Sequence, residues 1–426
     1  MKSQNDIAWE AFFEKYQVLA RIEKEGVFIA NASQMKAYRE PRLMAKFDHH
    51  INLPKIFTQN HLAILPVSRG DYIIAPFQAY HAFEPAEQTI THVSLPSHLQ
   101  SLRINDISSE TIAINCALAS GILSDFLEED ILYAAVSGRM GSGQFDFQIQ
   151  DSQFRSFIPV SVNNSQIEID AAFEGTRSLS LIEAKRDLSE DFLIRQLYYP
   201  FRLWHSRITK QVKPVFLVYS NGIFHLYEYT FQNMERYNSL LLIKHKNYTI
   251  EDTAIEFSDL LEIAKGVQPV PEPEISFPQA NSLERVINLC ELLNTQPLSR
   301  EQVTERYAFD TRQTNYYTDA ARYLGLLEKQ YGEKHKPVYF LSSFGKRVMQ
   351  LNYKQRQLAF CEAILQHRPF LETFQWFVKT GFMPNTEVIA DIMRASGLYH
   401  VKSATTYERR SSTISSWIVW MIGLTK

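Results

Sequence analysis

The sequence predicts an α/β protein with a mixed central sheet that continues into a helical C-terminal part. Five strand-like stretches surround one helical stretch that begins near residue 189; they are residues 145–149, 165–173, 179–185, 214–219 and 223–231. This β-β-β-α-β-β order is typical of a sheet with both parallel and antiparallel neighbours and helices packed against it. Beyond residue 281 the apolar residues recur mostly with helical spacing.

The length predicts several domains. The chain has 426 residues, and domains usually contain roughly 100 to 200. The proline-rich stretch QPVPEPE favours an extended connection. We predict an N-terminal α+β region, the sheet-containing core, an acidic and proline-rich linker and two helical units, with bounds 1–110, 111–250, 251–280, 281–350 and 351–426.

Composition favours an ordinary globular protein. Apolar residues make up 45% and charged residues 21% of the chain. No uninterrupted apolar run approaches the roughly 20 residues needed to cross a bilayer, and the first residues lack the apolar core of a signal peptide. The cysteines, Cys116, Cys290 and Cys361, are widely spaced and form no CxxC pair. We therefore expect a cytoplasmic protein with no membrane partner, no disulfide framework and no structural zinc.

Charge is unevenly distributed along the chain. Residues 281–426 contain 19 Lys and Arg against 13 Asp and Glu, a net charge of +6, whereas residues 1–280 contain 25 against 34, a net charge of −9. A basic C-terminal third behind an acidic body is compatible with a nucleic-acid-binding region attached to a catalytic or scaffold domain.

Several elements are expected before the central strands. Residues 6–24 have helical periodicity, and residues 61–83 predict a hairpin that turns at residues 68–71. Residues 111–137 are predicted to be helical, followed by a glycine-rich loop at residues 138–143. Backbone amides of this loop, together with Arg139, could approach a phosphate; the alternative is a tight helix-to-strand turn without a ligand.

The most informative residues lie on two neighbouring strands, QIEID at residues 166–170 and LIEAK at residues 181–185. Alternation places Glu168 and Asp170 on one face of the first strand, and Glu183 and Lys185 on one face of the second. The second strand is otherwise apolar enough to be buried, and buried charges are costly without partners or a metal. We therefore expect two acids and a lysine to converge.

Phosphodiester hydrolysis would explain this arrangement. The carboxylates of Asp170 and Glu183, with the carbonyl of Ala184, supply hard oxygen ligands for Mg²⁺, for which Mn²⁺ can substitute. Lys185 would orient or deprotonate the attacking water and offset charge in the transition state. The alternative is a cross-strand ion pair between Glu183 and Lys185 on a half-exposed sheet. The order of an acid, ExK on the next strand and then a polar helix favours catalysis.

Asp170, Glu183-Ala184-Lys185 and Gln196 in this order resemble the PD-(D/E)xK nuclease superfamily, and residues 135–231 resemble a group of type II restriction endonucleases within it. The resemblance implies a restriction-endonuclease-like core in which Asp170 and Glu183 bind Mg²⁺ and Lys185 assists the nucleophilic water. Gln196 matches a helix glutamine that some relatives place beside the active site. One departure is Ile169, which stands where the motif has proline.

Other roles stay open at this stage. Tyr199 accompanies Gln196 at the site or is a core aromatic residue. Glu168 is an indirect contributor to the site or simply exposed. A further acid that faces the metal comes from one of three residues, Glu128, Glu129 and Asp146.

Residues 281–350 fit a winged helix, a DNA-binding fold of three helices and a β-hairpin wing. Ser299 with Gln302 forms a capping box at the second helix, and the third helix is predicted to begin near Asp310. Its N-terminal residues suit base edges in the major groove, whereas basic residues of the wing suit phosphates. The candidate DNA contacts are Arg312, Gln313 and Asn315 of the helix and Lys334 and Lys336 of the wing.

A second helix-turn-helix-like unit is expected within residues 351–426. Arg409 and Arg410 begin a helical stretch, and an offset of 98 residues brings Arg312 onto Arg410 and Gly325 onto Gly423. Winged helices also mediate protein contacts, which is the alternative role for both units. Trp417 and Trp420 are expected in the core.

The combined expectation is a Mg²⁺-dependent, sequence-specific double-stranded DNA endonuclease of a type II restriction–modification system. A cognate DNA methyltransferase would protect the host DNA, and cutting both strands suggests a homodimer on DNA, with residues 1–110 contacting DNA or the second subunit. Two alternatives remain: a structure-specific or repair nuclease with the same core, and a non-catalytic winged-helix regulator.

Overall fold

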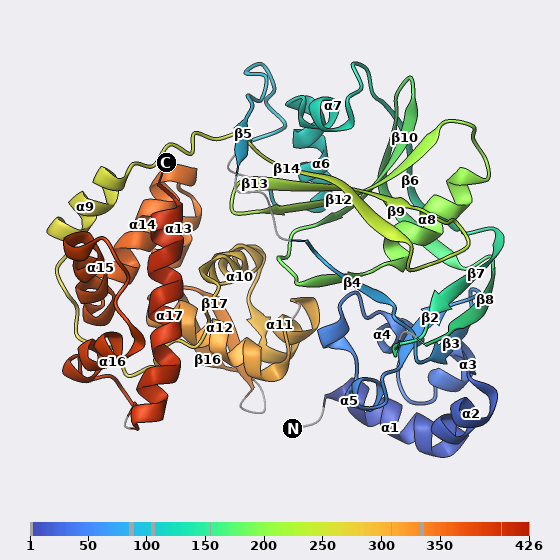
Figure 1. Ribbon diagram of the computed structural model, residues 1–426, viewed down its shortest axis with the longest axis horizontal. Helices are drawn as coiled ribbons and strands as arrows, with labels where there is room; N and C mark the ends of the chain where they lie inside the picture. The colour runs from blue at the N-terminus through green and yellow to red at the C-terminus, as the bar shows by residue number, and fades with distance from the viewer. Residues whose placement is uncertain are drawn as a thin grey trace.

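The computed structural model describes residues 3–84, 89–103, 107–153, 155–307, 309–332, 336–401 and 403–425. The chain forms an N-terminal part of short helices and strands, a seven-stranded sheet with helices, and a C-terminal helical part that contains a small sheet (Figure 1). The predicted α/β class, with a mixed central sheet and a helical C-terminal part, is confirmed.

The N-terminal part surrounds a three-stranded antiparallel sheet of order β1-β3-β2. The predicted helix at residues 6–24 is two helices, because Gln17 adopts a left-handed φ of 47° between them. The predicted hairpin is confirmed as β2 and β3. The elements are α1 (Gln4–Tyr16), α2 (Val18–Glu25), β1 (Phe28–Asn31), α3 (Ala32–Met35), α4 (Pro41–Ala45), the 3₁₀ helix η1 (His50–Asn52), α5 (Lys55–Gln59), β2 (Ala63–Pro66), β3 (Asp71–Ala75) and β4 (Tyr80–Ala82).

The central sheet has the order β5-β14-β13-β12-β10-β9-β6. Strand β10 is parallel to β12 and antiparallel to β9. Beside the sheet, β7 pairs with β8 and β11 pairs with β4. The strands are β5 (Ile90–His92), β6 (Tyr133–Gly141), β7 (Gln144–Gln150), β8 (Phe157–Asn163), β9 (Gln166–Glu174), β10 (Ser178–Lys185), β11 (Asp191–Leu193), β12 (Gln211–Ser220), β13 (Ile223–Phe231) and β14 (Leu240–Thr249).

Helices cover both faces of the sheet. The helices α6 (Glu110–Ala119) and α7 (Ile122–Leu127) share a core with Ile182 and Ala184 of β10. Helix α8 (Arg195–His205) contacts β9, β10 and β12 and shares a different core with Leu181. Because side chains alternate along a strand, Glu183 and Lys185 point to the face that carries α8.

The prediction for residues 133–141 was wrong. They form strand β6 rather than the end of a helix and a loop, and only Ser142 and Gly143 make the turn into β7. The stretch YAAVSG has no strong local preference, and pairing with β9 determines its conformation. Residues 157–163, for which no strand was predicted, form β8.

The C-terminal part has one hydrophobic core that extends from Leu260 to Met421, so residues 281–350 and 351–426 do not have separate cores. The predicted caps at Ser299 and Asp310 are confirmed, and a sheet of order β15-β17-β16 follows the helices. The elements are α9 (Phe257–Gly266), α10 (Leu283–Thr295), β15 (Leu298–Ser299), α11 (Arg300–Arg306), α12 (Thr311–Tyr323), β16 (Leu327–Tyr331), β17 (Pro337–Leu341), α13 (Ser343–Met349), α14 (Tyr353–Leu365), α15 (Arg368–Thr380), α16 (Thr386–Ala395) and α17 (Ala404–Gly423).

The segment predicted as a linker is docked on the C-terminal part. Residues 257–266 form helix α9, and the proline-rich stretch after it packs against the C-terminal helices. Glu272 accepts a hydrogen bond from the hydroxyl of Tyr323, and the indole of Trp417 donates to the carbonyl of Ala280 at 2.8 Å. The connection, residues 257–280, is therefore packed against the C-terminal helices and is not a free spacer; we call residues 267–280 the docked strap.

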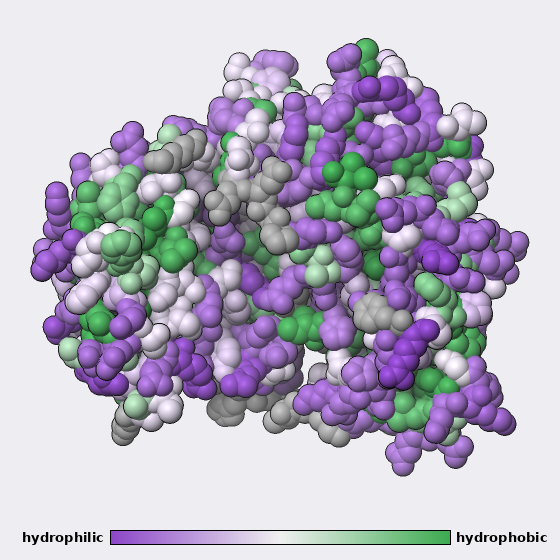
Figure 2. Space-filling model, in the orientation of Figure 1, coloured by the Kyte–Doolittle hydropathy of each residue, from purple (hydrophilic) through white to green (hydrophobic). Residues whose placement is uncertain are grey.

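No helix among the described residues is both long and apolar enough to span a bilayer. The face seen in Figure 2 is largely hydrophilic, with apolar side chains in separate groups.

The turn between β9 and β10 depends on Glu129. This carboxylate, 3% exposed, accepts hydrogen bonds from the backbone amides of Thr176 and Arg177, both at 3.1 Å, and from the hydroxyls of Thr176 and Ser178, both at 2.9 Å. Burial alone would raise its pKa, but these hydrogen bonds lower the pKa of Glu129 to about 2. The turn also needs Gly175, because a Cβ there would lie 2.4 Å from Cδ of Glu129.

Replacing Glu129 by alanine is expected to lower the free energy of unfolding by roughly 2 to 4 kcal/mol, because several donors lose their acceptor. The pKa is depressed in the folded state, so the stabilisation by Glu129 is present above about pH 4.5 and is lost as the pH falls towards 2. Urea unfolding at pH 7 and at pH 3 tests both statements. The exposed neighbour Glu128 provides the control, and equal stability of Glu128→Ala and Glu129→Ala would contradict the prediction.

Candidate active site

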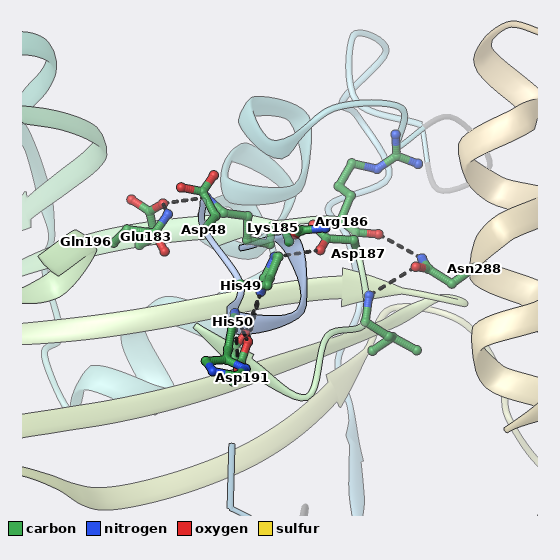
Figure 3. Close-up of polar contacts among 12 residues, drawn as sticks. Asp48, His49, His50, Glu183, Lys185, Arg186, Asp187, Asp191, Gln196 and Asn288 are labelled. Atoms are coloured by element: carbon green, nitrogen blue, oxygen red, sulfur yellow. Dashed lines mark hydrogen bonds and ion pairs between the residues drawn. The ribbon is translucent and has the colours of Figure 1, made fainter. Parts of the chain in front are cut away.

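The residues predicted to be catalytic meet at the C-terminal end of β10 (Figure 3). The Nζ of Lys185 donates to Oε1 of Glu183 and, at 3.3 Å, to the carbonyl of Ala184. From α8, Nε2 of Gln196 donates to the same Glu183 oxygen at 2.7 Å. From β9, Oδ2 of Asp170 accepts from the backbone amide of Ala184 at 2.8 Å. The structure thus brings Asp170, Glu183, Lys185 and Gln196 together.

Asp170 lies at a bulge of β9. Between the residues that face Val136 and Gly138 of β6, strand β9 has one residue more than β6. A bulge interrupts the alternation of side chains and re-aims them. Glu168 is exposed and pairs with Arg139 at 3.3 Å, whereas Asp170 turns to β10. Of the two roles considered for Glu168, the structure thus shows the exposed one.

At this site the pKa of an acid, Glu183, and the pKa of a base, Lys185, are both raised. Burial raises the pKa of Glu183 to about 7; Lys185 opposes this rise, and the negative charges of Asp170 and Asp48 add to it. Burial alone would lower the pKa of Lys185, but the carboxylates of Glu183, Asp48 and Glu110 raise it above its ordinary value. At neutral pH Lys185 is therefore an ammonium ion, and Glu183, with a pKa of about 7, is protonated in about half of the molecules.

Two acids at this site come from distant parts of the chain. Asp48 lies in the N-terminal part, has a side chain 19% exposed and contacts Lys46 at 3.4 Å; Figure 3 draws it beside Glu183. Glu110 is the first residue of α6, and burial, with Asp170 and Asp187, raises its pKa against the effect of Lys185. The N-cap Ser109 marks the helix start in the sequence, but no local signal relates either acid to β10.

The acids considered as further metal-facing residues have other roles. Glu129 holds the β9–β10 turn, Glu128 is exposed and pairs with Lys244 at 2.7 Å, and Asp146 is exposed on β7. Tyr199 is fully buried and donates to the carbonyl of Pro66 at 3.0 Å, so it is a core residue. Asp48 and Glu110 are instead the additional acids at the site.

The segment that follows Lys185 contacts His49, a buried histidine of the N-terminal part. The Nε2 of His49 lies 3.3 Å from Asp187, and its Nδ1 lies 2.6 Å from the carbonyl of Asp191 and 3.5 Å from its carboxylate (Figure 3). Burial would lower the pKa of His49, but hydrogen bonds and charge from Asp187 and Asp191 raise it to about 10. A protonated His49 therefore places one positive charge between two acids next to the site.

Replacing His49 by alanine is expected to lower the free energy of unfolding by about 3 kcal/mol at pH 7, because it leaves two partly buried acids, Asp187 and Asp191, without their cation. Since the folded pKa is raised, the stabilisation is fully present below about pH 6.5 and is lost as the pH rises through about 10. Unfolding by urea from pH 6 to 10 measures this slope in the wild type and the variant. The exposed His98 serves as control, and an unchanged slope in His49→Ala would contradict the assignment.

The donor set suits a hard divalent cation. Within the described residues no group of three or more His, Cys, Asp or Glu side chains is arranged to hold a metal ion. Mg²⁺, however, keeps several waters and often takes only one or two protein carboxylates. Asp170, Glu183 and the carbonyl of Ala184 offer such oxygens at one strand end. By their chemistry these residues fit Mg²⁺ or Mn²⁺.

Helix α12 presents the predicted base-contacting residues at its N-terminus. Arg312 is exposed, and its Nε donates to the hydroxyl of Tyr316. Gln313 forms the capping box with Asp310, and its Oε1 accepts a hydrogen bond from the backbone amide of Asp310 at 3.4 Å. Asn315 is half-buried. Arg312 is thus the most accessible of the three.

The other predicted phosphate contacts are only partly available. Lys336 is exposed but pairs with Glu301 at 3.4 Å, and Lys334 lies outside the described residues. Arg139 is exposed on β6 and pairs with Glu168, in a strand rather than in the predicted loop.

The two arginines predicted on the last helix differ. Arg409 is exposed, whereas the guanidinium of Arg410 donates to the carbonyl of Phe277 and holds the docked strap. Burial and the charge of Arg409 lower the pKa of Arg410, and Tyr316 and Asp319 of α12 oppose them, so α12 and α17 lie close together here. Arg410 therefore holds residues 267–280 against α17, and its role as a DNA contact stays a prediction.

The proposed repeat is not matched by equivalent helices. Helix α12 has 13 residues and α17 has 20, and Gly325 follows α12 whereas Gly423 is the last residue of α17. The similarity at an offset of 98 residues is thus confined to the sequence.

Comparison with known proteins identifies three families without an assigned function. Residues 6–74 match the family "Domain of unknown function (DUF6996)", residues 75–249 match "Domain of unknown function (DUF6997)" and residues 285–426 match "Domain of unknown function (DUF7226)". No curated protein and no solved structure matches the chain. The three matched segments all contribute to the surroundings of β10: Asp48 and His49 come from the first, the catalytic candidates from the second and Asn288 from the third.

Proposed function

We propose that the protein is a Mg²⁺-dependent, sequence-specific double-stranded DNA endonuclease of a type II restriction–modification system. The observation that carries this proposal is the buried Glu183–Lys185 pair at a strand end, with Asp170 and Gln196 directed to the same point. The burial of Glu183, which is 9% exposed, supports this proposal over an ion pair on a half-exposed sheet.

The residues divide the chemistry among themselves. Asp170, Glu183 and the carbonyl of Ala184 would hold Mg²⁺, which when bound supplies charge that stabilises the transition state of phosphodiester hydrolysis. Lys185 is protonated, so it orients the attacking water and offsets negative charge rather than removing a proton. Gln196 holds the Glu183 carboxylate in place through its hydrogen bond of 2.7 Å.

The order of the elements supports a restriction-endonuclease-like core. Helix α6 and strands β6, β9 and β10 are followed by α8 and by β12, which lies parallel to β10. The acid, the ExK residues and the glutamine occur on β9, β10 and α8 in the order of the superfamily motif.

The C-terminal part supports DNA recognition. Helices α10, α11 and α12, with the sheet of β15, β16 and β17, occur in the order expected for a winged helix. We assign the base contacts to Arg312, Gln313 and Asn315, and phosphate contacts to Lys334, Lys336, Arg139 and Arg409.

A homodimer on DNA and a cognate DNA methyltransferase belong to the same proposal. Sedimentation velocity with and without DNA tests the dimer; a monomer under both conditions would argue against it.

The decisive experiment is incubation of the purified protein with long, unmethylated DNA of known sequence and Mg²⁺. Parallel reactions contain EDTA or the Glu183→Ala variant. Discrete fragments that are absent from both controls support a site-specific endonuclease, and sequencing of their ends identifies the site. A smear supports the structure-specific or repair nuclease. Tight DNA binding that Glu183→Ala leaves unchanged, without cleavage, supports a winged-helix regulator.

A further inference from the structure

A residue of the C-terminal part forms hydrogen bonds with the segment that follows β10, the strand of Glu183 and Lys185. Asn288 of α10 is 1% exposed. Its Nδ2 donates to the carbonyl of Arg186 at 2.7 Å, and its Oδ1 accepts from the backbone amide of Leu188 at 3.0 Å (Figure 3). The side-chain amide of Asn288 thus bonds a backbone carbonyl and the backbone amide two residues later. A neighbouring β-strand would satisfy the same two groups. The end of β10 is therefore tied to α10.

The same turn of α10 also holds the adjacent strand. Asn288 Nδ2 lies 2.8 Å from the hydroxyl of Ser220, the last residue of β12, and 3.0 Å from Glu291. Glu291 accepts from the Ser220 hydroxyl and from the amide of Asn221, both at 2.8 Å. Asn288 and Glu291 are three residues apart on α10, so one helical face fixes the ends of two parallel strands.

Helix α10 also contacts the proposed DNA-reading helix. It packs against α12 in the C-terminal core, and in Figure 1 it lies between the sheet and the C-terminal helices. Arg285 of α10 lies over the ring of Tyr317 of α12, 5.2 Å from its centroid, and bonds Glu190 at 3.1 Å. A continuous set of contacts thus leads from α12 through α10 to the residue that follows Lys185.

We propose that Asn288 is a positioning residue for the candidate active site. It holds Arg186 and Leu188 so that Lys185 stays against Glu183, and it is the point through which DNA bound at α12 acts on the catalytic strand. This inference rests on the proposed function and adds to it a route from DNA recognition to cleavage.

A purely structural role for Asn288 can be separated from this one, because the same interface contains a matched residue. Gln357 of α14 is 0% exposed and exchanges two hydrogen bonds with Asn221, at 2.7 and 3.2 Å. Gln357 thus joins the C-terminal part to the turn after β12 and not to the chain that follows β10. Losing either amide weakens the interface, but only loss of Asn288 releases the catalytic strand.

The test compares Asn288→Ala and Gln357→Ala in the full chain, on a DNA fragment that the wild type cuts. Three quantities are measured: the urea midpoint, the Kd for DNA in EDTA and the single-turnover cleavage rate with Mg²⁺. We expect both variants to lose stability and to keep Kd within about twofold. The cleavage rate should fall roughly 10- to 100-fold in Asn288→Ala only, since small displacements of catalytic groups cost factors of this size.

Hydrogen exchange of the wild type provides a second measurement in case Asn288→Ala does not fold. Exchange of the peptide that spans residues 183–190 is expected to slow severalfold when DNA binds in EDTA, and no change would overturn the coupling. Equal cleavage rates of the two variants, or losses that simply follow stability, would overturn the positioning role alone. A wild type that cuts no DNA would overturn the proposed function, and the role of Asn288 in cleavage with it.

Discussion

Replacing Glu183 by glutamine is expected to abolish Mg²⁺-dependent DNA cleavage, with a loss of roughly a thousandfold or more, because the side chain keeps its size but loses the charge that holds the metal. The fold should survive, since Asp48 and Glu110 still compensate the charge of Lys185. Cleavage rates with saturating Mg²⁺, together with circular dichroism, measure the two effects.

Without metal, the Glu183→Gln variant should differ from the wild type in how its stability depends on pH. The pKa of Glu183 is raised from 4.5 to about 7, so its contribution to stability is present below about pH 4.5 and is lost as the pH rises through 7. In EDTA, the Tm of the wild type should therefore fall relative to that of Glu183→Gln between pH 5 and pH 8.

The control for Glu183 is another buried acid of the sheet. Glu228 on β13 is 4% exposed and lies 3.6 Å from Lys213. Glu228→Gln removes a buried charge that two lysines, Lys213 and Lys244, contact, but it lies outside the candidate site, so cleavage should persist. If Glu183→Gln cuts DNA as fast as Glu228→Gln, the assignment of the active site is wrong.

Replacing Lys185 by methionine is expected to slow cleavage roughly 100- to 10,000-fold while the metal still binds. The side chain is 15% exposed, and its ammonium contacts both Glu183 and the carbonyl of Ala184. Its removal takes away a positive charge without removing a metal ligand. Titration calorimetry with Mg²⁺ or Mn²⁺ should therefore detect binding in Lys185→Met and none in Glu183→Gln.

Lys213→Met is the matched control. Lys213 lies on β12 opposite Ser180, near the start of β10, whereas Lys185 lies at the end of β10, opposite Val218 of β12. The side chain of Lys213 is 13% exposed. Its loss should affect stability but not the cleavage rate. Wild-type cleavage by Lys185→Met would exclude Lys185 from the mechanism and leave it as a partner of Glu183.

Features encoded by neighbouring residues could be predicted from the sequence. The strands β9 and β10 follow from short apolar alternation, and the caps at Ser299 and Asp310 follow from side chains that satisfy the first amides of a helix. The pair Glu183 and Lys185 belongs to the same class, because two residues apart on one strand they must share a face.

Local patterns failed where pairing with distant residues decides the conformation. Residues 133–141 carry no strong propensity and become a strand because β9 is available as a partner. The bulge of β9 that turns Asp170 to β10 is likewise a property of the pair β6 and β9 and not of either sequence.

Sequence alone thus determined the strands β9, β10, β12 and β13, the helix caps and the ExK pair, because periodicity and hydrogen-bonding needs act over a few residues. Tertiary structure decided which other residues join them. Asp48, Glu110 and Asn288 reach the end of β10 from three separate regions. Their approach depends on how whole helices and sheets pack, and no local pattern specifies which distant surfaces are complementary.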